Sequence, residues 1–167
     1  MAHIEKSVAT LRVIGDDLIP DEVSRLLGCP PTKSQIKGEV VRGNKTGRGY
    51  TMKTGMWRLE ADDCEPENLD AQVAELLGKL TNDLGVWSQL KERFDINLFC
   101  GLFAEESNVG ANLTAETLLA LGERGIELWL DIYGPTQELK DDDRCPCNSG
   151  ETYANCCKPK VLRTSHA

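Results

Sequence analysis

The sequence predicts an α+β fold in which helices pack mainly on one face of a single mixed, mostly antiparallel sheet. Three observations support this two-layer sandwich. Segments 8–14, 55–61 and 126–133 alternate apolar with polar residues, as half-buried strands do. Segments 69–80 and 114–125 place apolar residues at helical spacing. No long β-α-β-α-β run is present, which argues against a doubly wound sheet.

Local signals mark the first elements. The strand at 8–14 has alternate apolar residues on one face. Pro20 begins a helix that Gly28 ends, because proline fits the first helical turn and glycine adopts the left-handed conformation that follows the last turn. Residues 38–55 contain five glycines and several basic residues, which predicts a hairpin or mobile loop.

In the second half, Asn68 and Thr114 each precede a helical stripe and can cap it. The nearly continuous apolar run at 96–104 predicts a central strand buried on both faces. The last strand alternates strictly, and four of its residues are expected to face inward: Ile126, Leu128, Leu130 and Ile132. Trp129 and Tyr133 then share the opposite face, either under a helix or open for binding.

The charge of the chain is unevenly distributed. The net charge is −8, but residues 144–167 carry +3, which leaves −11 on residues 1–143. Because an acidic body repels phosphate, we expect a protein with a basic surface as the partner, and no nucleic acid. No run approaches the roughly 18 apolar residues of a membrane span. The first residues lack the apolar centre of a signal peptide, so the expected location is the cytoplasm, and no pattern indicates an oligomeric state.

Four of the seven cysteines form the pattern C-x-C-x8-C-C: Cys145, Cys147, Cys156 and Cys157. Zinc takes four soft donors in a tetrahedron, so the pattern predicts one structural zinc per chain in a small C-terminal zinc knuckle. Iron, a disulfide and four unliganded thiols are the alternatives. Zinc is the commoner occupant, and a bond between neighbouring cysteines would be strained. Cys29, Cys64 and Cys100 are interpreted as ordinary core or loop thiols.

The segment CPCNSGETYANCC resembles the SEC-C motif, a zinc-binding tail of many bacterial proteins, whose usual form is CPCGSGKKYKxCC or the same with a final histidine. The resemblance implies the same four cysteines as zinc ligands. Asn148 replaces the first glycine of the motif. Glu151, Thr152 and Ala154 replace the usual lysines, which weakens any inherited affinity for anionic partners.

Residues 8–134 resemble an uncharacterised bacterial domain family described only as a domain of unknown function. The residues that carry this resemblance are Gly-Asp-Asp after the first strand, Leu-Leu-Gly-Cys-Pro-Pro, and Thr-Gly-x-Trp before a strand. The resemblance implies no activity, and an immunity-like role is one expectation for small acidic families of this kind. The predicted domains are listed in chain order: an acidic α+β domain (1–135), a polar linker (136–143), the zinc knuckle (144–158) and a basic tail (159–167).

Candidate catalytic residues are few. His3 and His166 lie in terminal segments, which argues against a histidine general base. The pairs Asp16–Asp17 and Asp62–Asp63 are candidates for metal binding or acid–base work. Because neighbours on a strand point in opposite directions, we interpret both pairs as turns. The glycine-rich segment 43–50 lacks the residue order of a phosphate-binding loop.

Two functions remain. The first is a non-catalytic protein-binding or adaptor module, favoured because no catalytic constellation is recognisable. The alternative is an enzyme that uses Asp or Glu carboxylates with an unidentified cofactor. Trp57, Trp87 and Trp129 serve either the core or a binding groove. A deep pocket with converging carboxylates would favour the enzyme.

Overall fold

A computed structural model of the protein describes residues 4–42, 49–106, 109–134, 140–142, 144–145 and 149–156. The chain divides into two units, Met1–Pro135 and Thr136–Ala167. The finer division of the second unit into linker, knuckle and basic tail stays a prediction. No helix among the described residues is long and apolar enough to cross a membrane.

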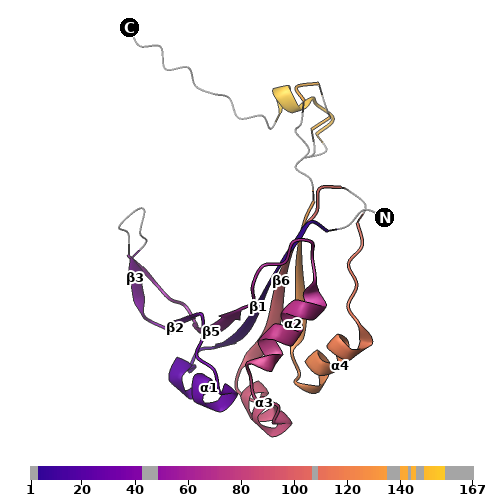
Figure 1. The fold of residues 1–167 in the computed structure, drawn as a ribbon. Coiled ribbons are helices and arrows are strands. Elements are labelled where there is room, and N and C mark those ends of the chain that lie inside the picture. Colours follow the sequence, from indigo (N-terminus) through magenta and orange to yellow (C-terminus); the bar gives the residue numbers. More distant parts are fainter. Residues whose placement is uncertain are drawn as a thin grey trace. The chain divides into compact units, whose positions relative to one another are not determined.

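The first unit is built on an open five-stranded sheet with the strand order β2-β5-β1-β6-β7 (Figure 1). Its strands are β1 (Lys6–Gly15), β2 (Lys33–Gln35), β5 (Gly55–Glu60), β6 (Asp95–Phe103) and β7 (Glu127–Tyr133). Neighbouring strands are antiparallel except β6 and β7, which are parallel. Parallel neighbours need a crossover, and a helix lies between these two in sequence. The predicted mixed, mostly antiparallel sheet is confirmed.

Four helices lie on one side of the sheet, as predicted (Figure 1). They are α1 (Pro20–Leu27), α2 (Leu69–Gly78), α3 (Leu84–Lys91) and α4 (Ala115–Glu123). Asn68 caps α2 by accepting a hydrogen bond from the Ala71 amide at 3.0 Å, and Thr114 caps α4. Gly28 follows α1 with φ of 80°, so the predicted helix ends are confirmed.

The core lies between the sheet and the helices. Trp57 of β5 and Trp87 of α3 are fully buried in it. β1 contributes Ala9, Leu11 and Val13, which alternate along the strand and have at most 1% of their surface exposed. Two of the three tryptophans therefore serve the core.

A hairpin extends from the sheet before β5. Strands β3 (Val40–Arg42) and β4 (Gly49–Thr51) pair antiparallel as a separate two-stranded sheet, which confirms a hairpin in this glycine-rich region. Residues 43–48 of the glycine-rich segment lie outside the described residues. Strand β2 was not predicted, because three residues are too few to show a periodic pattern.

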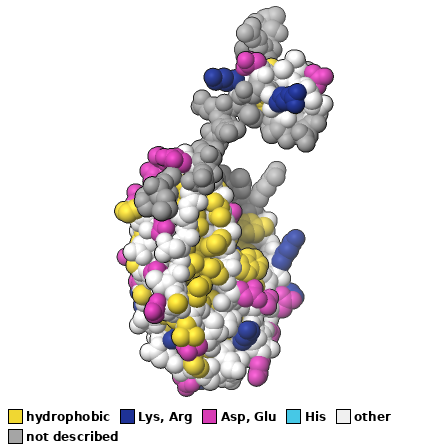
Figure 2. All heavy atoms as spheres, turned by 90° about the vertical axis from the view of Figure 1, so that its right-hand side faces the viewer, with side chains coloured by type: hydrophobic (Ala, Val, Ile, Leu, Met, Phe, Trp, Pro, Cys, Tyr) yellow, Lys and Arg dark blue, Asp and Glu magenta, His cyan; other side chains and the backbone are white. Residues whose placement is uncertain are grey.

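One burial prediction is confirmed and another is wrong in part. β6 is a central strand, and its residues 96–102 are buried on both faces apart from half-buried Phe99, so the predicted buried central strand is confirmed. Ile126, directly before β7, and Leu128 on β7 pack in or against the core as expected, but Leu130 and Ile132 are 46% and 61% exposed. The helices do not extend over the second half of β7. Figure 2, which views the side of the molecule that carries α4, shows hydrophobic side chains exposed in a band.

Candidate binding face and metal segment

The face of the sheet away from the helices, called the open face here, is defined by strand register. The first row across it, from β2 to β7, consists of Lys33, Arg58, Arg12, Asn97 and Glu127. The second row consists of Glu60, Thr10, Phe99 and Trp129. Two further rows contain Val8, Gly101 and Asp131, then Lys6, Phe103 and Tyr133. Aromatic and charged side chains therefore share one continuous surface.

Aromatic rings occupy the β6–β7 half of the open face. Trp129 and Tyr133 are 50% and 48% exposed, and no described helix covers them. The rings of Phe103 and Tyr133 stack with their centroids 4.8 Å apart. Gly101 lies next to this stack, because a Cβ added there would be 3.4 Å from the Phe103 ring. Of the two arrangements open at the sequence level, the exposed aromatic pair is the one observed.

Carboxylates hold the polar ends of the exposed rings. The Trp129 indole donates to Glu127 at 3.1 Å, and the Tyr133 hydroxyl donates to Asp131 at 2.6 Å. The second hydrogen bond raises the pKa of Tyr133. Each ring is therefore oriented by the residue two positions earlier on its own strand, which points to the same face.

Arg12 lies at the centre of the open face. Its guanidinium carbon is 4.4 Å from the centroid of Phe99 and 5.3 Å from that of Trp129. Its Nε donates to Oδ1 of Asn97 at 2.7 Å, and Asn97 is only 1% exposed. Burial, together with the nearby charge of Arg58, lowers the pKa of Arg12. The guanidinium is thus fixed in place by two rings and one buried amide.

Arg58 lies directly opposite Arg12 on β5, with Lys33 on its other side. Lys33 pairs with Glu60 at 2.9 Å. Nε of Arg58 is buried and has no hydrogen-bond partner among the described residues. Sequence analysis missed both arginines, because each is an ordinary polar residue in an alternating strand. Only the register of β1 with β5 reveals that the two are adjacent.

The predicted carboxylate pairs lie apart, near opposite ends of β1. Asp16 and Asp17 form a turn after β1, as interpreted from the sequence, and bind Lys37 and Arg93. Asp63 pairs with Lys6 at 2.6 Å, at the other end of the strand. These side chains therefore act as ion-pair partners of surface cations, and the two pairs do not converge.

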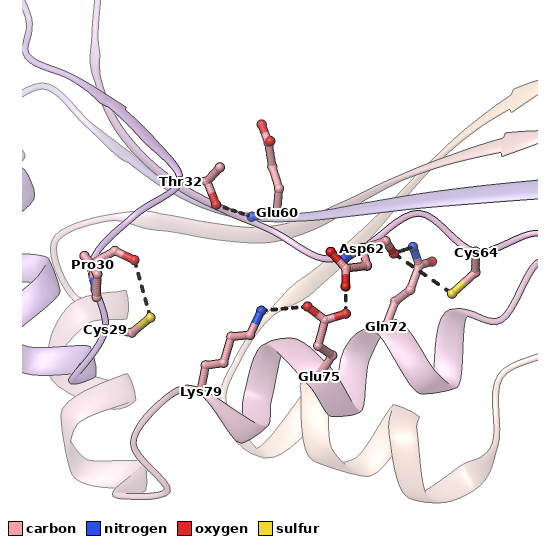
Figure 3. Close-up of polar contacts among 9 residues, drawn as sticks. All are labelled: Cys29, Pro30, Thr32, Glu60, Asp62, Cys64, Gln72, Glu75 and Lys79. Atoms are coloured by element: carbon pink, nitrogen blue, oxygen red, sulfur yellow. Dashed lines mark hydrogen bonds and ion pairs between the residues drawn. The ribbon is translucent and has the colours of Figure 1, made fainter.

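The remaining polar residues in this region connect α2 to the loop after β5 (Figure 3). Gln72 donates to the carbonyls of Asp62 at 2.7 Å and Ser7 at 3.1 Å, and accepts from the Ser7 hydroxyl at 2.8 Å. Glu75 accepts from Lys79 and from the Asp62 amide, and the hydrogen bond from Lys79 is the main reason that the pKa of Glu75 is lowered. These hydrogen bonds attach α2 to β1 and to the loop after β5, which is a structural role.

The scattered cysteines and the interior offer no reactive arrangement in the described part of the chain. Cys29 and Cys64 contact backbone carbonyls, and burial raises the pKa of Cys100 to about 12. A small apolar gap between the sheet and the helices, without room for a water molecule, is lined by aliphatic side chains such as Leu76 and Leu98. No carboxylate lines that gap.

In the second unit, backbone hydrogen bonds close a turn that begins next to Cys145, one of the predicted zinc ligands. Arg144 pairs with Thr152 in an antiparallel bridge, and the Cys145 amide donates to the Glu151 carbonyl at 2.9 Å. A 3₁₀ helix (Tyr153–Asn155) then leads to Cys156. Cys147 and Cys157, the other two predicted ligands, lie outside the described residues.

The donor chemistry of this turn fits a metal ion. Cys145 is 4% exposed, and the Ser149 hydroxyl donates to the sulfur of Cys156 at 3.3 Å, as partners of metal-bound thiolates do. Gly150 adopts φ of 84°, which permits the reversal between the two cysteines. Among the described residues no three potential ligands gather, and half of the predicted set falls outside that part of the chain.

Comparison with known proteins identifies both parts of the chain. Residues 5–135 match the family described as Domain of unknown function (DUF4279), and residues 143–159 match the SEC-C motif. No curated protein and no solved structure matches the chain. Since the first match covers more than half of the residues, the chain belongs to the DUF4279 family of domains of unknown function and carries a SEC-C motif after that domain.

Proposed function

We propose that this protein is a non-catalytic protein-binding module that recognises its partner through the open face of the sheet. The observation that carries the proposal is the exposed aromatic surface of Phe103, Trp129 and Tyr133. Aromatic and arginine side chains are enriched at the centres of protein interfaces, where they contribute most of the binding energy. The rings are oriented by hydrogen bonds and stacking, so little conformational entropy is lost on binding.

The partner that this surface fits has basic side chains on its binding surface. Glu127 and Asp131 lie beside the exposed rings on β7, so a lysine or arginine can contact a carboxylate and an aromatic face together. The charge of −11 on residues 1–143 adds long-range attraction, which mainly raises the association rate. An immunity-like adaptor, which binds and neutralises a basic protein, is one form of the proposed protein-binding function.

The SEC-C segment supplies a structural zinc site in this proposal, with Cys145, Cys147, Cys156 and Cys157 as ligands. The support is the match to the motif, the closed turn, and the hydroxyl directed at the Cys156 sulfur. Four protein thiolates leave no coordination position for a catalytic water, so the metal would stabilise the fold of the segment. It would supply no chemistry.

Affinity capture from a lysate of the native host tests the proposal. The bait carrying Trp129→Ala and Tyr133→Ala should lose the partner that the unchanged protein captures. Tyr50→Ala is the matched control, because Tyr50 is 54% exposed but belongs to the β3–β4 hairpin. Circular dichroism establishes that each bait is folded.

With the captured partner purified, its association rate should fall as salt rises, while dissociation changes less. Retention of the partner by the double variant would show that the open face is not the binding surface. An association rate that does not depend on salt would refute the proposal that the partner has a basic binding surface.

A further inference from the structure

The open face contains four cations, and within the part of the chain that the structure describes two of them have carboxylate partners. Lys6 pairs with Asp63 and Lys33 with Glu60. Arg12 and Arg58 form no ion pair in the described part of the chain, although the protein has 27 acidic residues. Instead the two arginines occupy opposite positions on neighbouring strands, and the charge of Arg58 contributes to the lowered pKa of Arg12.

This juxtaposition is unfavourable for the folded protein alone. Like charges directly opposite on antiparallel strands destabilise a sheet. Nε of Arg58 is also buried, and no group in the described ranges of the chain forms a hydrogen bond with it to offset its desolvation. Arrangements that reduce stability and that no internal group compensates are typical of functional sites. An anionic group that contacts both guanidiniums would compensate both effects.

The geometry favours a carboxylate. Guanidinium groups bind carboxylates through pairs of parallel hydrogen bonds. The Arg12 group is oriented in advance by Asn97 and by two rings. Trp129 lies in the neighbouring row and is half exposed, so it can pack against the side chain next to the bound carboxylate.

We infer that Arg12 and Arg58 together bind one carboxylate of a protein segment that lies across the open face, with an aromatic or aliphatic neighbour of that carboxylate against Trp129. The inference rests on the proposed function, because the carboxylate belongs to the same partner. That partner's basic side chains meet Glu127 and Asp131 at the β7 edge. The open face thus binds a carboxylate at the two arginines and a cation at the β7 edge.

The surrounding charge disfavours a nucleic acid at this position. Glu60, Glu127 and Asp131 share the face with the two arginines. A nucleic acid presents a continuous series of phosphates, which these carboxylates and the net charge of −8 would repel. A single carboxylate needs only contacts with the two arginines.

The test is a titration of the isotope-labelled full-length protein, followed by NMR through the Nε–H signals of its arginines. The probe is N-acetylphenylalanine, and its uncharged amide is the control compound. The signals of Arg12 and Arg58 should shift saturably with the acid and not with the amide. Arg58→Gln should weaken binding about tenfold or more, since hydrogen bonds between charged groups are lost. Arg25→Gln, on the exposed side of α1, should bind as the unchanged protein does.

Arg58 is the residue to change first, because replacement of Arg12 would also remove the partner of buried Asn97. A second measurement is the melting temperature, which the acid should raise in the unchanged protein and not in Arg58→Gln. The captured partner should bind Arg58→Gln more weakly and Arg25→Gln normally.

Several outcomes would overturn the inference. They are the absence of a saturable shift, equal binding by the amide, tighter binding of inorganic phosphate than of the acid, or Arg58-dependent binding of a single-stranded oligonucleotide. A partner that needs Trp129 but is indifferent to Arg58 would refute the carboxylate site and leave the proposed function intact. Probe binding at the arginines without any captured protein would support the site and count against the proposed function.

Discussion

Replacement of Arg58 by methionine is expected to stabilise the folded protein, which few substitutions on a sheet do. Methionine keeps the apolar stem that packs along β5 and removes the charge opposite Arg12. Relief of a like-charge cross-strand pair contributes about 0.2–1 kcal/mol. Removal of a buried, unpartnered Nε adds up to about 1–3 kcal/mol, which we reduce because the side chain is only partly buried. The expected gain is about 1 kcal/mol, or roughly 3 °C in melting temperature.

Arg12→Met is the matched comparison, and the expected sign is opposite. That change leaves the amide of Asn97, which is 1% exposed, without its partner and removes the contact with the Phe99 ring. The expected loss is about 2 kcal/mol. Urea unfolding followed by tryptophan fluorescence measures both, because Trp57 and Trp87 are buried in the core of the first unit. The gain from Arg58→Met should shrink at high salt, since the charge repulsion is then screened.

If Arg58→Met destabilises the protein as much as Arg12→Met does, Arg58 has a stabilising contact, and the argument for a strained anion site is wrong.

Three further predictions follow from the other contacts. Gln72→Leu should lower the free energy of unfolding by about 2–4 kcal/mol, because the Ser7 and Asp62 groups lose buried hydrogen bonds. Gln35→Leu, at a half-buried position at the end of β2, should lower it by less than about 1 kcal/mol, and equal losses would contradict the network. The pKa of Glu75 is lowered, so the contribution of this carboxylate to stability is present above the ordinary value of 4.5 and is lost as pH falls through the lowered pKa. Glu75→Gln should therefore reduce the free energy of unfolding at pH 7 and make it decline less steeply toward acid pH. An unchanged profile would show that the ion pair with Lys79 contributes nothing. Elemental analysis should find one zinc per chain in protein purified without added metal. Removal of the metal by a chelator should leave the unfolding transition of the first unit, followed by fluorescence, unchanged. Iron in place of zinc, or four titratable thiols, would refute the zinc site.

The amino-acid sequence was sufficient for most of the secondary structure, for the fold class and for the motif at the C-terminal end. Helix ends are set by single residues such as Asn68 and Gly28, whose effect depends on a few neighbouring backbone groups. Apolar periodicity distinguishes a strand from a helix without reference to the rest of the chain. The SEC-C pattern is equally local, since its ligands lie within 13 residues.

The composition of the open face depended on tertiary structure. Periodicity tells which residues share a face of a strand, but not whether a helix covers that face. For this reason Leu130 and Ile132 were expected inside and lie exposed. Arg12 and Arg58 are 46 positions apart in the sequence, and only the pairing of β1 with β5 places them side by side. Register and coverage follow from contacts between distant segments, so the candidate binding face becomes visible only when those segments are assembled.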